Sequence, residues 1–136
     1  MNAIETIRPL VDGSGLLTAI DVYSDRELAD QRVGIRLTFA ENVLFVYPDG
    51  TDDSICVSST FPALLSDSSI HREHAPSAWA SAIGHPILWA WTMTNTQGRV
   101  DGIQIEFGTV ETPSIALQML VRASTVIVRV LLVTSR

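Results

Sequence analysis

The chain contains no lysine, so its nine basic side chains are all arginines. Acidic residues outnumber them at 15, and the formal net charge is −6. Nucleic acids and anionic membrane surfaces bind proteins through clustered lysine and arginine, which attract phosphate groups. The shortage of basic residues therefore argues against both as the main partner of this protein.

Cysteine is almost absent, because Cys56 is the only one in the chain. A single cysteine cannot form an internal disulfide, which fits a reducing compartment, and we expect a cytoplasmic location. In the run 54–58, Cys56 is interpreted as a small strand residue. A nucleophilic thiol needs an electropositive, partly exposed setting, so we do not expect catalysis from Cys56 in this acidic chain.

Long apolar segments are also missing, since no run approaches the ~18 residues of a membrane span. The longest, residues 125–133, is interrupted by Arg129 and has the length of a strand. The first residues lack the basic start, the continuous apolar stretch and the small-residue cleavage site of a signal peptide. We therefore expect no membrane span and no signal peptide.

Signatures of metal, phosphate or acid–base chemistry are weak. His71 and His74 are three residues apart, which lets two imidazoles reach one ion on a helical turn, but the pattern supplies no third ligand. The segment 13–15 lacks the lysine and the preceding strand of a phosphate-binding loop. Asp101 and Glu106 are five residues apart, so on one strand they point to opposite faces. We expect no catalytic residue, no metal site and no cofactor.

What the chain does have is apolar residues in alternating runs. Hydrophobic residues make up 46% of its 136 residues, a length that fits one domain with a single core. The clearest runs, 87–93 and 103–107, flank the polar segment 95–99 as in an antiparallel hairpin. With a period of two, Trp89 and Trp91 fall on the apolar face of the first run, so we expect both in the core.

Further strands and a helix complete the expected set of elements. Alternation predicts the other strands at 16–23, 33–39, 43–47, 55–58, 115–119 and 125–133. Residues 66–69 and 71–74 are polar and aperiodic, which predicts a loop. Residues 76–83 predict a short helix before a glycine, and residues 3–11 fit either a helix or an extended lead-in.

The order of these elements predicts the architecture. We expect a single α+β domain, residues 1–136, that is predominantly antiparallel β. Two four-stranded meanders, 16–58 and 85–134, are joined by a helix-bearing connection, 59–84, whose short helix packs against the sheet.

The two meanders also resemble each other in sequence. Residues 34–40 and 102–108 share a leading glycine, the same alternation, and a Phe followed by a small residue. An internal duplication explains this match, and so does the general likeness of amphipathic strands, so both interpretations stay open.

Negative charge is concentrated at turns. Asp49, Asp52 and Asp53 lie together after the run 43–47, where Pro48 and a glycine favour a turn. Such a cluster is commonly only solvated surface. Its functional interpretation is a docking site for a basic protein, because opposite charge speeds association and selects the partner.

One stretch of the chain carries a family resemblance. Its features are Trp79, Ile83-Gly84-His85-Pro86-Ile87, Trp89, Trp91, the turn at 98–101, the run 103–107 and Ala123-Ser124. This arrangement resembles a family of small uncharacterised bacterial proteins, and in size and composition the chain is similar to immunity proteins of bacterial toxin systems. The resemblance covers residues 79–124 and implies a non-enzymatic binding protein, without giving any residue a role.

Three functions are consistent with these patterns. We first predict a cytoplasmic, non-enzymatic protein-binding module, immunity-like, whose acidic surface binds a basic partner. The alternative is a small-molecule-binding protein or enzyme that combines the tryptophan pair with charged strand residues. The four residues of this predicted site are Trp89, Trp91, Arg36 and Glu106. The third is a self-associating structural dimer that uses an edge strand or an outer sheet face. That face comprises Leu88, Ala90, Leu120 and Leu131.

Overall fold

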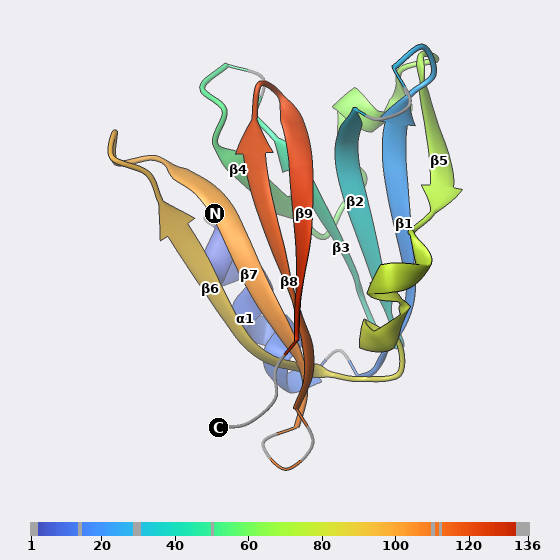
Figure 1. The fold of residues 1–136 in the computed structure, drawn as a ribbon, viewed down its shortest axis with the longest axis vertical. Coiled ribbons are helices and arrows are strands. Elements are labelled where there is room, and N and C mark those ends of the chain that lie inside the picture. The colour runs from blue at the N-terminus through green and yellow to red at the C-terminus, as the bar shows by residue number, and fades with distance from the viewer. Residues whose placement is uncertain are drawn as a thin grey trace.

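Two antiparallel sheets make up most of the protein, whose computed structural model describes residues 3–13, 15–28, 31–49, 51–109, 111 and 113–132 (Figure 1). Sheet A has the strand order β4-β3-β2-β1-β5 and contains β1 (Leu17–Asp25), β2 (Arg32–Phe39), β3 (Val43–Pro48), β4 (Ile55–Ser58) and β5 (Ile70–His74). Sheet B has the order β6-β7-β8-β9 and contains β6 (Ile87–Thr94), β7 (Val100–Gly108), β8 (Pro113–Arg122) and β9 (Thr125–Leu132). The helices are α1 (Ala3–Gly13) and the 3₁₀-helices η1 (Ala63–Ser66) and η2 (Ser77–Ala82).

Each sheet is built on a meander of four consecutive strands, as the alternation predicts. Strands β1 to β4 pair in chain order, and so do β6 to β9. The predicted α+β class, mostly antiparallel with two four-stranded meanders, is therefore confirmed.

The polar segments 66–69 and 71–74 were predicted as a loop, but the structure has a strand at 70–74. β5 pairs with β1, with His74 opposite Asp21 and Ile70 opposite Asp25. Because β5 lies at the edge of sheet A, most of its side chains are exposed rather than alternately buried. Charged side chains on an edge strand discourage further pairing. They also remove the apolar alternation by which a strand is recognised in the sequence.

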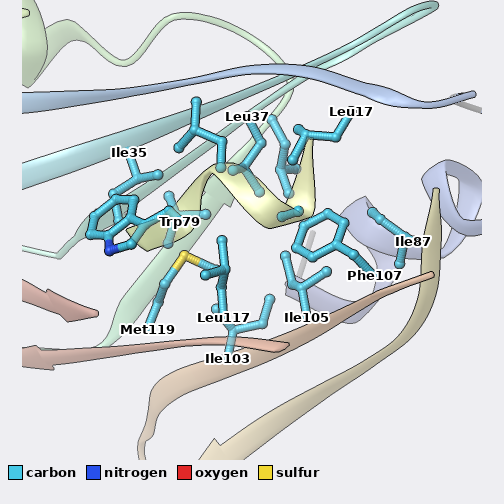
Figure 2. Packing of buried hydrophobic residues seen from close by; sticks show 14 of the residues in the cluster. Leu17, Ile35, Leu37, Trp79, Ile87, Ile103, Ile105, Phe107, Leu117 and Met119 are labelled. Carbon is cyan, nitrogen blue, oxygen red and sulfur yellow. The ribbon is translucent and has the colours of Figure 1, made fainter. Parts of the chain in front are cut away.

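The core lies between the two sheets (Figure 2). Its main side chains come from the inward faces of β1, β2, β7 and β8, and they are Leu17, Ile35, Leu37, Ile103, Ile105, Phe107, Leu117 and Met119. All of them are fully buried. Each such side chain stabilises the fold by about 1.5–3 kcal/mol relative to an exposed one.

Helices α1 and η2 each contact strands of both sheets. α1 contacts β6 and β4, and its Ile7 and Leu10, which share one helix face, are buried. η2 contacts β8 and β1, and its Trp79 points into the core on the side of Ile35 and Met119 (Figure 2). The predicted short helix is thus a 3₁₀-helix, and the lead-in is helical.

A β-bulge interrupts the alternation at the start of β6. Ile87 pairs with Phe107, but the next pair joins Trp89 to Glu106, so Leu88 is an extra residue on β6. An extra residue moves every following side chain to the opposite face of the strand.

The bulge explains why the two tryptophans are outside the core. Trp89 is 45% exposed and Trp91 is 43% exposed, while Ala90 takes the inward position opposite Ile105. The prediction that Trp89 and Trp91 are core residues is therefore wrong, because alternation was extended through a bulge that leaves no mark in the sequence.

Candidate functional site

The outward side chains of sheet B form one surface, which we call the tryptophan face. Strand register places them in three rows that run across β6, β7, β8 and β9. The rows are Trp89–Glu106–Ala116–Leu131, Trp91–Gln104–Gln118–Arg129 and Met93–Gly102–Leu120–Ile127. The alternate residues, such as Ile105 and Leu117, point into the core.

Large hydrophobic side chains are exposed on this face. Trp89 and Trp91 lie on the edge strand β6, and Leu131, which is 38% exposed, lies on the opposite edge strand β9. Single exposed hydrophobic residues are common on protein surfaces, whereas several gathered on one sheet face mark an interaction site.

The polar residues of the tryptophan face lie in its middle and at one edge. Gln118 donates a hydrogen bond from Nε2 to Oε1 of Gln104, 3.2 Å away, on the two central strands. Glu106 is only 3% exposed, and Arg129 is exposed on β9. These two are the charged residues of the face, one of each sign, so the face is neutral in a chain of net charge −6.

The third row is closely packed around a glycine. A Cβ on Gly102 would lie 2.6 Å from Cδ2 of Leu120 and 2.9 Å from Cε of Met93, so these two side chains meet over the glycine. Glycine is needed here for space and not for an unusual backbone angle. The third row is therefore apolar, and its side chains are packed closely against one another.

Arg36 does not join the tryptophans. It lies on the outward face of sheet A, opposite Asp21 on β1 and Phe45 on β3, with its guanidinium 5.7 Å from the ring centroid of Phe45. A second apolar cluster, which includes Tyr23, Phe45 and Leu65, covers part of that face. The two faces are on opposite sides of the molecule, so the predicted site of Trp89, Trp91, Arg36 and Glu106 is not assembled.

The acidic turn between β3 and β4 is held by its own carboxylates. Oδ1 of Asp49 accepts hydrogen bonds from the backbone N–H and hydroxyl of Thr51, and Oδ1 of Asp52 accepts the same pair from Ser54. The bonds from Ser54, aided by the charge of Arg99, lower the pKa of Asp52 below its ordinary value. Asp52 therefore keeps its negative charge near neutral pH.

Asp53 connects this turn to sheet B. Its backbone has φ of 56°, and its carboxylate accepts a hydrogen bond of 2.9 Å from the backbone N–H of Ser124 in the β8–β9 turn. Arg99, from the β6–β7 turn, donates to the backbone carbonyl of Asp52 at 3.3 Å. A polar hollow of about 360 Å³ lies among these three turns, lined by aspartates and by Arg99 and Arg122. The acidic turn thus has a structural role in joining the two sheets.

The reactive side chains of the described residues are dispersed. His71 is paired with Glu73, and Nδ1 of His74 lies 3.2 Å from Oδ1 of Asp21, so these histidines do not share one ligand position. No group of three or more His, Cys, Asp or Glu side chains in the described part of the chain could hold a metal ion.

Cys56 has the wrong surroundings for a nucleophile. Burial raises the pKa of its thiol, and the negative charges of Asp49 and Asp52 raise it further. A thiol with a raised pKa carries little thiolate at neutral pH, so its reactivity is low.

The sequence was also compared with known proteins. A family model described as a family of unknown function, DUF6334, matches residues 10–132. The chain belongs to this family. No curated protein and no solved structure matched it. The predicted resemblance to a family without an assigned activity is confirmed, and it extends over a much longer segment than residues 79–124.

DUF6334 membership places both candidate surfaces within the matched segment. The tryptophan face and the acidic turn lie inside residues 10–132, so both belong to the family domain. No helix among the described residues is long and apolar enough to cross a membrane. Sequence reasoning missed Gln104, Gln118 and Arg129 as members of the face, because their common row depends on register across three strand pairs.

Proposed function

We propose that this DUF6334 protein is a non-enzymatic protein-binding module and that its tryptophan face is the docking surface. The observation that carries the proposal is the exposure of Trp89 and Trp91 side by side on one strand, at 45% and 43%. Tryptophan is enriched among the residues that contribute most binding energy in protein interfaces, because it buries a large apolar area at low entropic cost.

The dispersion of reactive groups supports binding over catalysis. Arg36 lies across the molecule from Glu106, and the thiol of Cys56 is kept protonated by its surroundings. Hollows of about 310 and 360 Å³ are present, and neither is lined by a tryptophan. Catalytic constellations need a nucleophile, a base and an orienting group within hydrogen-bonding reach of one another.

The acidic character of the chain supports a finer form of the proposal. A cytoplasmic, immunity-like module would neutralise a basic partner, with charge from Asp49, Asp52 and Asp53 guiding association. The free Cys56 is consistent with a reducing compartment. The tryptophan face carries the main proposal, because the carboxylates of the acidic turn are already engaged in holding that turn and the β8–β9 turn.

Site-specific photo-crosslinking in cells tests the docking surface. A photoreactive residue replaces Gln118, at the centre of the tryptophan face, or Arg72, which is exposed on β5. We expect protein adducts from position 118 and none from position 72, and we expect Trp91→Ser to remove them. Mass spectrometry of the adduct identifies the partner. Equal labelling at both positions, or none at position 118, would contradict the proposal.

A further inference from the structure

We infer that the partner seated on the tryptophan face is a second copy of this chain, related by a two-fold axis parallel to the strands of sheet B. This inference rests on the proposed function, since it names the partner of the same surface. The order of side chains within the three rows, and above all the positions of the two charges, supports this symmetry.

A two-fold axis parallel to the strands keeps each row and reverses the strand order. β6 of one copy then lies over β9 of the other, and β7 lies over β8. This is the aligned class of sheet packing, in which strand directions differ by about 30°. Two-fold symmetry makes the contact isologous, so each pairing between different positions occurs twice.

In this arrangement the row that contains Arg129 is complementary to the same row of the second copy. Trp91 is the β6 member of the row and Arg129 is the β9 member. Reversal of strand order places the indole of Trp91 against the guanidinium of Arg129 from the second copy. Tryptophan is the best aromatic partner for a cation, and the attraction increases when both groups lose water.

The remaining positions are also compatible. Trp89 meets Leu131, both exposed, and Met93 meets Ile127, both half-buried, so apolar side chains at one edge cover those at the other. Glu106 lies over Ala116, and because these residues are only 3% and 1% exposed in the single chain, they add little contact area. Since Glu106 is only 3% exposed in the single chain, its carboxylate has already lost most of its contact with water, and a second copy adds little desolvation there.

The alternative face-to-face symmetry is disfavoured by charge. A two-fold axis that lies in the plane of the interface but runs perpendicular to the strands places each strand over the same strand of the second copy. It also reverses the order of the rows. Arg129 would then face Arg129, and Trp91 would face Trp91. Two guanidinium groups brought together without a carboxylate repel each other at an interface that excludes water. Charge therefore selects the axis parallel to the strands.

The size of the face sets the expected affinity. A standard protein interface uses 20–30 residues from each partner. The tryptophan face has fewer, so we expect a weak dimer with a Kd on the order of 10 μM.

Sedimentation equilibrium of the purified full chain, at concentrations on both sides of that Kd, tests the inference with an exchange of residues. Trp91→Arg alone should weaken dimerisation at least ~10-fold, because it sets two arginines against each other. The double variant Trp91→Arg/Arg129→Trp should restore the Kd to within ~3-fold, because each new arginine meets a new tryptophan. Positions 91 and 129 lie on opposite edge strands of one sheet, so rescue within a single chain is excluded.

Arg72→Glu on β5 and the melting temperature of each variant serve as controls. In 1 M salt, where its added negative charge is screened, Arg72→Glu should leave the dimer in place. Unchanged melting temperatures show that loss of association is not loss of fold. The inference is overturned if Trp91→Arg leaves the Kd of the dimer unchanged, or if the double variant does not restore that Kd. A monomer at all concentrations overturns it as well; the proposed function then stands if position 118 crosslinks to a different protein and fails if it crosslinks to none.

Discussion

Asp53 is the residue on which the connection between the acidic turn and sheet B depends most. Its positive φ is a conformation that Asp and Asn adopt more readily than Ala, and its carboxylate accepts from Ser124. We expect Asp53→Ala to destabilise the fold by about 1–2 kcal/mol, from the lost hydrogen bond and the backbone preference together. Urea denaturation measures the change. Asp53→Asn keeps an acceptor oxygen and tolerates the same backbone, so it should cost clearly less; equal costs would contradict this role.

Ser54 controls the ionisation of Asp52. A carboxyl whose folded pKa lies below its unfolded value stabilises the fold above the unfolded pKa, and this contribution is lost as pH falls through the folded pKa. The pKa of Asp52 is lowered from an ordinary value of 3.8, first by the side-chain bond from Ser54, so the loss belongs to the region below that pH. Ser54→Ala should raise the pKa of Asp52, measured by carboxyl ¹³C titration in NMR.

A second aspartate offers a matched comparison. In Asp67, the largest cause of the lowered pKa is the backbone N–H of Ser69, and its hydroxyl comes second. Ser69→Ala should therefore raise the pKa of Asp67 by less than Ser54→Ala raises that of Asp52. The reverse order would show that the hydroxyls do not dominate at the acidic turn.

Gly102 shapes the third row of the tryptophan face. A methyl group there would overlap Leu120 and Met93 and would lie 3.3 Å from the backbone oxygen of Met119, which cannot move freely. We expect Gly102→Ala to cost about 1–3 kcal/mol in thermal or urea unfolding, as overpacking does elsewhere. Gly13→Ala, where nothing lies within 4 Å of the new Cβ, is the control and should cost far less.

At the scale of elements, the bulge in β6 decides which surface the protein presents. Deletion of Leu88 removes the extra residue and leaves Ile87 inward with Trp89 and Trp91 outward, so the fold should survive with a loss of roughly 1–2 kcal/mol. Deletion of Ala90 would instead bring Trp91 into the small inward position opposite Ile105. Thermal unfolding and quenching of tryptophan fluorescence by acrylamide distinguish the two. Similar loss of structure in both deletions would contradict this account of the bulge.

The same bulge shows which features of the fold the alternation of apolar residues can predict and which it cannot. Alternation predicted the eight meander strands, because a residue that faces the core must be apolar whatever its neighbours are. It placed Trp89 and Trp91 on the wrong face, since the extra residue Leu88 is as apolar as the residues around it. It missed β5, where Arg72 and the other polar side chains of an edge strand carry no alternation.

The candidate site was less predictable than the fold. The acidic turn was recognised as a cluster of charge, but its contact between Asp53 and Ser124 joins residues 71 positions apart. The tryptophan face depends on register across β6 to β9, which places Arg129 in the same row as Trp91. Local composition contains neither distance nor register, so such surfaces are found only in three dimensions.

For the whole molecule, the net charge and the neutral tryptophan face together predict how self-association responds to salt. Two copies that each carry −6 repel one another, while the contact between them is neutral and largely dry. Salt shortens the screening length from about 10 Å at 0.1 M to about 3 Å at 1 M, which weakens the long-range repulsion more than a buried contact. Self-association should therefore become tighter as salt rises, and sedimentation equilibrium at the two salt concentrations measures this.

A basic partner would respond to salt in the opposite way. Attraction between unlike charges is screened, so binding that depends on Asp49, Asp52 and Asp53 should weaken as salt rises. Arg72→Glu sharpens the comparison, because replacing a positive by a negative side chain takes the net charge from −6 to −8 outside the tryptophan face. It should make the dimer weaker at low salt and its tightening with salt steeper. If self-association of both the unchanged chain and Arg72→Glu weakens as salt rises, then unlike charges, and not an apolar face, hold the two copies together.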